Sequence, residues 1–246
     1  MHAPFALEGA LDSGSAASPV TYAAIPGSGP VIVSGGVEVP ASAFAAAGQP
    51  GVFRADLTRL GVTPMDLGSF PAIGETVDGC DQLQYLKMQM WHDSTRTFLA
   101  RYPNLQANGD WAFLNAASGS ASGFSVQPAD QARVMRWVSE EAPYVHGYWD
   151  WDWADQILGV TNISSIKGVV TVSTAAAAGV GKTNARWVGL NLLSELDAVG
   201  EYYISKSGVL SYMPSTPPAS WASAPIVSVA ERCYPDATSD VQTSWR

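Results

Sequence analysis

The sequence has few charged residues, and this scarcity excludes several classes of protein. Charged residues make up 14% of its 246 positions, against roughly 25% in an average soluble domain. Lys and Arg number 13 and Asp and Glu number 22, so the formal net charge is −9. Nucleic acids and anionic membrane surfaces bind clustered cations. We therefore predict neither as a partner.

Histidine and cysteine are too scarce for a metal centre or a disulfide scaffold. His2, His92 and His146 are not at metal-ligand spacing from one another, so no metal site is predicted. Cys80 and Cys233 are compatible with one bridge or with two buried thiols. No apolar run approaches the roughly 20 residues of a membrane span. The first residues lack both a basic segment and a continuous apolar stretch, so no signal peptide is expected.

Residues that favour turns and short strands are abundant. The 23 glycines and 16 prolines stand among many Ser, Thr and Val residues, a composition typical of short strands joined by tight turns. Residues 201–214 alternate around the turn KSG and predict a β-hairpin. A short helix is expected after Pro128. The sequence therefore predicts a mostly β fold with a few short helices.

One stretch is unusually rich in aromatic residues, YVHGYWDWDWADQ at residues 144–156. If it is extended, Trp149, Trp151 and Trp153 share one face, while Asp150 and Asp152 share the other. A row of tryptophans can stack on sugar rings, and aspartates can accept hydrogen bonds from sugar hydroxyls or act as acid and base. In the alternative interpretation the tryptophans fill the core and the aspartates face water or cap turns.

The candidate substrate-binding residues are the ionisable and aromatic members of this stretch. They are His146, Trp149, Asp150, Trp151, Asp152, Trp153 and Asp155. A glycosylation sequon begins at Asn162, which matters if the chain is secreted.

Several blocks of the sequence occur in an order that suggests a known family. Residues 11–36 place the turn DSG before PVTYAAIPGSGPVIVSGG, and residues 98–104 read FLARYPN with Trp111 following. Residues 145–155 and residues 186–214, the latter RWVGLNLLSELDAVGEYYISKSGVLSYMP, complete the series. In order and approximate spacing the blocks resemble the secreted, pectate-lyase-like right-handed parallel β-helix proteins, which include glycoside hydrolases and polysaccharide lyases.

The resemblance implies a division of the chain into three parts. Residues 1–40 would form the first β-helix coils, and residues 41–214 an inserted β-rich, sandwich-like subdomain. Residues 215–246 would form a return strand and an irregular tail. The pattern departs from the family after about Val229. The chain is therefore expected to be the N-terminal part of a longer protein, or a shortened relative, with the missing C-terminal coils as a partner.

The resemblance also implies a location and a function. It implies an extracellular or cell-surface protein that supplies the scaffold of a glycoside hydrolase acting on complex polysaccharide, without a cofactor. Catalytic carboxylates would lie on later coils, and no residue of this chain matches a family catalytic motif. The aromatic stretch is accordingly predicted to be mainly architectural, with a contribution to a carbohydrate cleft. The alternative is a non-catalytic glycan-binding or cell-surface structural protein that uses a β-helix as its scaffold.

Overall fold

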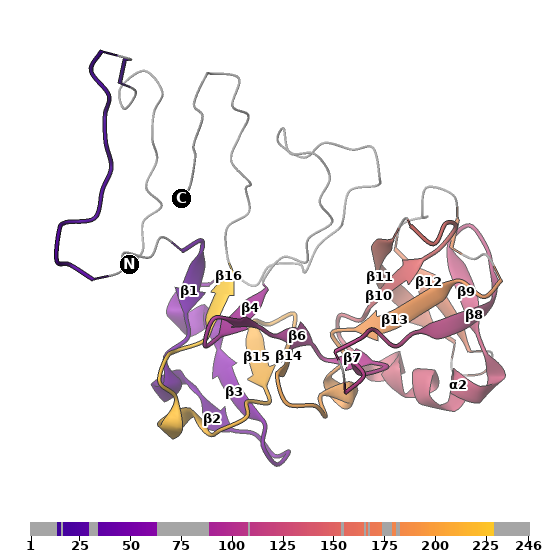
Figure 1. The fold of residues 1–246 in the computed structure, drawn as a ribbon. Helices are drawn as coiled ribbons and strands as arrows, with labels where there is room; N and C mark the ends of the chain where they lie inside the picture. Colours follow the sequence, from indigo (N-terminus) through magenta and orange to yellow (C-terminus); the bar gives the residue numbers. More distant parts are fainter. Residues whose placement is uncertain are drawn as a thin grey trace.

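The structure is a computed structural model and is mostly β, as the composition predicts. It describes residues 14–15, 17–29, 34–62, 89–107, 109–153, 155–164, 166, 168–173, 179–180 and 183–228. Figure 1 shows a barrel beside a short helix on one side of the molecule, and two smaller sheets on the other side. Cys80 and Cys233, and with them the question of a bridge, lie outside the described residues.

Six antiparallel strands close the barrel. Around the barrel the order is β10, β11, β12, β9, β8, β13 and back to β10. The strands are β8 (Leu114–Gly119), β9 (Gly123–Val126), β10 (Tyr144–Tyr148), β11 (Gln156–Ile163), β12 (Val169–Val172) and β13 (Arg186–Leu190). A short strand, β7 (Arg101–Tyr102), pairs with the end of β13. Closure removes the free sheet edges that would otherwise be open to further pairing.

The strands β10, β11 and β13 carry buried apolar residues on both of their faces. Val145, Leu158 and Trp187 point into the barrel and belong to its interior cluster. Alternate residues on the same strands point outward and are buried in a second cluster with residues of the smaller sheets. The outward-facing residues are Tyr144, Ile157, Val188 and Leu190. The barrel wall is therefore also the surface on which the rest of the chain packs.

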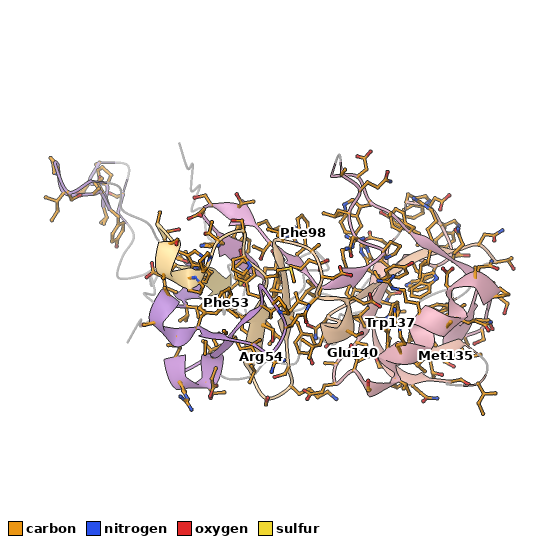
Figure 2. All side chains as sticks on the ribbon, turned by 90° about the horizontal axis from the view of Figure 1, so that it is seen from below. Phe53, Arg54, Phe98, Met135, Trp137 and Glu140 are labelled. Carbon is orange, nitrogen blue, oxygen red and sulfur yellow. The ribbon has the colours of Figure 1, made fainter. Side chains whose placement is uncertain are left out.

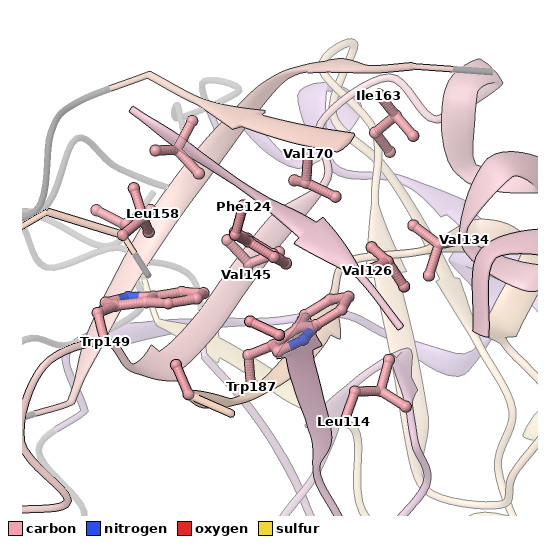
Figure 3. Close-up of a cluster of buried hydrophobic side chains, with 14 of the residues drawn as sticks. Leu114, Phe124, Val126, Val134, Val145, Trp149, Leu158, Ile163, Val170 and Trp187 are labelled. Carbon is pink, nitrogen blue, oxygen red and sulfur yellow. The ribbon is translucent and has the colours of Figure 1, made fainter. Parts of the chain in front are cut away.

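Three aromatic rings fill the barrel interior. Phe124 lies with its ring centroid 4.8 Å from that of Trp187 and 5.1 Å from that of Trp149 (Figure 3). Trp187 in turn contacts Trp137 edge-on at 6.2 Å. Large rings in edge-on or tilted contact bury much apolar area at favourable geometry. These contacts tie the strands to the helical segment that lies beside the barrel.

The helical segment comprises α2 (Pro128–Val134), which starts at the predicted proline, and the 3-10 helix η3 (Met135–Ser139). A buried ion pair fastens it to the 3-10 helix η4 (Leu193–Glu195). Glu195 is 1% exposed and accepts hydrogen bonds from the Arg133 guanidinium at 2.6 Å and from Trp137 Nε1 at 2.7 Å. A buried carboxylate needs such partners to offset its desolvation.

A second carboxylate caps η4, since Glu140 accepts from the backbone N–H groups of Leu193 and Ser194. Figure 2 shows Trp137 and Glu140 at the helical end of the molecule, with Phe53 and Arg54 on a smaller sheet at the other end.

The two smaller sheets gather strands from both ends of the described chain. One has the order β2 (Ala45–Ala46), β3 (Phe53–Asp56), β15 (Val209–Tyr212), β14 (Glu201–Ile204) and β6 (Phe98–Leu99). The other has the order β1 (Gly36–Glu38), β16 (Ile226–Ser228), β4 (Met90–His92) and β5 (Thr95–Arg96). Three further 3-10 helices are η1 (Ala41–Ala43), η2 (Leu57–Leu60) and η5 (Pro218–Ser220). The predicted hairpin over residues 201–214 is confirmed as β14 and β15.

The expected parallel β-helix and sandwich are not what the described residues form. Their ladders are antiparallel except for the short pair β6 and β14. Within the expected first coils, residues 36–38 lie antiparallel to β16, while residues 1–13, 16 and 30–33 lie outside the described ranges. The expected sandwich is corrected to a barrel joined to a smaller sheet, because β10 pairs on both edges and closes the sheet on itself.

A small residue in β10 makes room for the barrel core. A Cβ added to Gly147 would lie 2.6 Å from the ring of Trp149. We expect Gly147→Ala to lower the free energy of unfolding by about 1–3 kcal/mol, because the indole would have to leave its packed position. Gly48→Ala is the matched control, since a Cβ there meets nothing within 4 Å. Urea denaturation of both variants checks this, and equal stabilities would contradict the packing described.

Candidate functional site

Within the aromatic stretch, β10 ends at Tyr148 and β11 begins at Gln156. The described residues between the two strands form a loop. The predicted extended alternation through Trp153 is therefore wrong. Trp149 turns into the barrel core, 2% exposed, and its Nε1 donates a hydrogen bond to the carbonyl of Gln156 at 3.1 Å. Because this bond joins the two ends of the loop, the residues between them are held away from the core.

Two tryptophans of this loop are displayed to solvent. Trp151 is 51% exposed and Trp153 is 78% exposed. Their rings are stacked, with centroids 5.5 Å apart and planes inclined by 14°. We call Trp151 and Trp153 the tryptophan pair. Large exposed aromatic surfaces mark interaction sites more often than isolated apolar residues do. Trp149 therefore fits the interpretation that the tryptophans fill the core. Trp151 and Trp153 fit the interpretation that they form an exposed binding surface.

Two charged contacts hold the loop against the barrel wall. Asp155 Oδ2 lies 2.6 Å from His146 Nε2, and His146 stands on β10. Asp152 Oδ1 accepts from Arg186 Nε at 3.4 Å, and Arg186 opens β13. Asp150 is half-buried within the same loop. The structure therefore brings together the predicted residues His146, Asp152 and Asp155 through partners on two adjacent strands.

Further aromatic residues surround these contacts. The guanidinium of Arg186 lies over the rings of Tyr148 and Phe113, 4.6 and 4.9 Å from their centroids. Trp111 contacts His146 edge-on at 5.5 Å, and Arg101 lies over Trp111 at 4.4 Å. We call the residues in these contacts the barrel-end cluster. Its six members are Arg101, Trp111, Phe113, His146, Tyr148 and Arg186.

Sequence reasoning missed Phe113, Tyr148 and Arg186 as parts of this site. Phe113 directly precedes β8, and Arg186 begins β13, so the pairing of β8 with β13 brings them together. Register across such distant segments leaves no local signal. The aromatic residues Trp111 and Phe113 just before β8 were the available hint, since cations commonly stack on aromatic faces.

Two carboxyl groups near the cluster have shifted pKa values of opposite sign. The hydrogen bond from His146 lowers the pKa of Asp155, against the effect of partial burial. Burial raises the pKa of Glu201 to about 7, although the backbone N–H groups of Ala198 and Asp197 oppose this. Glu201 is buried on β14, facing Arg101, whose own pKa burial lowers to about 10. Asp155 is thus a carboxylate acceptor at neutral pH, while Glu201 is enclosed.

The remaining candidate residues lie apart from the cluster. Asn162 is exposed on β11, opposite Thr171, so the sequon is on the surface. His92 is buried between Tyr212 and Trp221 in the smaller sheets, with its Nδ1 3.0 Å from the Tyr212 hydroxyl. Across the described residues, no three His, Cys, Asp or Glu side chains are grouped to hold a metal ion. In the same ranges no helix has the length and apolarity to cross a membrane.

Comparisons with known proteins give little beyond this geometry. No family model matches the chain, and no curated protein matches it. A solved structure named "Glycoside hydrolase" is similar at 14% sequence identity, with a TM-score of 0.48. The similarity covers 78% of this chain and 31% of that one, so this chain spans about a third of its length. The activity named there is that protein's own, and the function below is argued from the site.

The pair of His146 and Asp155 predicts an acid-sensitive contribution to stability. Because the pKa of Asp155 is lower in the folded chain, its carboxylate stabilises the fold above the unfolded pKa of Asp. This stabilisation is lost as pH falls through the folded-state pKa. We expect Asp155→Asn to be less stable than wild type at pH 6, by less than about 1 kcal/mol because the pair is half-exposed. The difference should shrink as pH falls below the unfolded pKa of Asp and vanish once the carboxyl group is protonated in the folded chain as well. Denaturant titrations across this range check it, and a constant difference would contradict the assignment.

The raised pKa of Glu201 predicts that the free energy of unfolding depends on pH in the opposite direction. Its folded-state pKa is raised, so its contribution is fully present below the unfolded pKa and is lost as pH rises through about 7. Glu201→Gln keeps a hydrogen-bond acceptor and removes the titration. We expect wild type to lose on the order of 2–3 kcal/mol relative to this variant between about pH 4.5 and about pH 8. Parallel pH profiles of unfolding free energy would contradict the burial cost.

Proposed function

We propose that this chain is a non-catalytic scaffold that contacts glycan through the loop at residues 149–155, within a larger carbohydrate-active protein. The observation that carries the proposal is the tryptophan pair, because Trp151 and Trp153 present stacked rings to solvent beside ionised carboxylates. A folded chain gains no core packing from rings in this position, so their exposure calls for a partner.

The chemistry of a sugar ring matches this surface. The C–H groups on one face of a pyranose carry partial positive charge and pack on the electron-rich face of an indole. The rings of Trp151 and Trp153 stack on each other, so each ring steadies the other and a sugar would pack on an outer face of the stack. Sugar hydroxyls at the rim of a stacked ring can donate to Asp152 and Asp155, whose carboxylate oxygens are acceptors.

The charge states favour binding over hydrolysis at this loop. Glycoside hydrolysis by a carboxyl pair requires one member to stay protonated near neutral pH, through a raised pKa. The pKa of Asp155 is lowered instead. The pKa of Glu201 is raised, but its side chain is buried. Its carboxyl group accepts from the backbone N–H groups of Asp197 and Ala198. We therefore assign catalysis, if the parent protein is a hydrolase, to residues outside this chain.

The arrangement of the sheets supports a place for the chain within its parent. β1 pairs with β16, and Val39 N–H donates to the carbonyl of Pro225 at 2.8 Å. Residues 39–225 thus leave and re-enter at one point, as a module inserted in a longer chain would. We propose that the segments on either side of this module connect it to the coils of a parallel β-helix in an extracellular glycoside hydrolase.

Binding to polysaccharides tests the proposal directly. In affinity electrophoresis through gels that contain a panel of soluble polysaccharides, at least one should retard the chain. We expect Trp153→Ala to weaken that binding at least about tenfold, because the lost stack accounts for much of the contact area. Trp153→Phe should keep part of it, since a smaller ring still stacks.

A matched control separates the loop from the general loss of an exposed apolar side chain. Val199 is 65% exposed and lies away from the loop, between η4 and β14. Val199→Ala should migrate as wild type does in every gel, and circular dichroism should show all variants folded. Retention of wild-type affinity by Trp153→Ala would overturn the proposal, and release of oligosaccharides by this chain would overturn its non-catalytic part.

A further inference from the structure

We infer that the glycan that binds the tryptophan pair is uncharged, and that polyuronates and sulfated glycans are rejected. This inference rests on the proposed function and adds the substrate class to it. The observations that carry it are the acidic side chains around Trp151 and Trp153 and the contacts and burial of the basic side chains beside them.

The loop that carries the tryptophan pair is acidic. Asp150, Asp152 and Asp155 alternate with or flank the two tryptophans over six positions. The side chain of Asp152 is 77% exposed and that of Asp155 is 48% exposed, so both face the solution that a ligand would enter. A carboxylate or sulfate on each sugar of a polymer would meet these like charges repeatedly as the chain lay across the pair.

The basic side chains beside the loop contact other groups within the described part of the chain. Arg186 is stacked on Tyr148 and Phe113 and is paired with Asp152. His146 is paired with Asp155. An anionic sugar that approached Arg186 would also meet the carboxyl group of Asp152 beside the same guanidinium.

Arg101, the third basic residue of the barrel-end cluster, is closed off from solvent. Its side chain is 2% exposed, lies over Trp111, and donates from Nε to the carbonyl of Pro103 at 3.0 Å. It therefore cannot form the bidentate contact with which arginines usually recognise a carboxylate or sulfate. An uncharged pyranose needs no such contact, because its face packs on the indoles and its hydroxyls donate to the aspartates.

A matched pair of polymers provides the test. Polygalacturonate and its carboxyl-reduced form share one backbone and differ in charge, and affinity electrophoresis of the full chain measures binding to both. If a neutral polymer of another backbone binds better, it is compared with its carboxylated derivative in the same way. We expect the neutral member to bind at least about tenfold more tightly at low salt, with the gap narrowing as salt screens the repulsion.

Two variants assign the discrimination to the loop. Asp152→Asn removes one negative charge beside Trp151 and Trp153 and releases Arg186, so it should raise affinity for the anionic member at least about threefold. Because Asp152 itself accepts from sugar hydroxyls in the proposed site, the readout is the ratio of the two affinities, which should shift at least about threefold toward the anionic member. Glu38→Gln makes the same change in net charge on β1, in another sheet, and should leave both affinities unchanged.

The outcomes separate this inference from the proposed function. If Trp153→Ala abolishes binding but the anionic polymer binds as tightly as the neutral one, the proposed function stands and the inference is overturned. Tighter binding of chitosan, a cationic glycan, than of the neutral polymers would also overturn it. If no polysaccharide binds, or if Trp153→Ala has no effect, the proposed function and the inference fail together.

Discussion

The pairing of β10 on both of its edges is the constraint on which the rest of the structure depends. Through its bonds to β11 and β13, this strand closes the barrel and places alternate side chains in two different cores. Val145 enters the barrel, and Tyr144 faces the smaller sheets. The same alternation places His146 and Tyr148 beside the loop that follows. Fold and candidate site are thus consequences of one strand register.

The loop after β10 holds one buried tryptophan, Trp149, and two exposed ones, Trp151 and Trp153. Trp149 is fixed in the core by its packing on Phe124 and its bond to Gln156. Asp152 and Asp155 are tied to neighbouring strands, so the intervening tryptophans have little freedom left to lose. A surface that is already ordered binds its ligand at a lower entropic cost than a flexible one. The same contacts involve the nearby basic side chains, so the inferred selectivity against anions has the same origin as the anchoring.

The sequence predicted features that depend on local patterns and failed where distant segments meet. The helix after Pro128 and the hairpin at residues 201–214 follow from a proline and a tight turn. Barrel closure joins β10 to β13, some 40 positions along the chain, and no local pattern records that register. The alternation expected through Trp153 failed because the indole of Trp149 folds back against Gly147 and ends the strand. Arg186 entered the site only through that non-local pairing.

Oxidation of tryptophan by N-bromosuccinimide, mapped by mass spectrometry with and without a bound neutral glycan, tests the central claim most directly. In the free chain Trp151 and Trp153 should react early, while Trp149, Trp137 and Trp187, each buried, should react only on unfolding. Bound glycan should protect Trp151 and Trp153, and leave unchanged the oxidation rate of Trp221, which is half-buried against the smaller sheets. Early oxidation of Trp149, or unchanged oxidation of the tryptophan pair when glycan is bound, would contradict the division of this loop into a buried anchor and a glycan-binding surface.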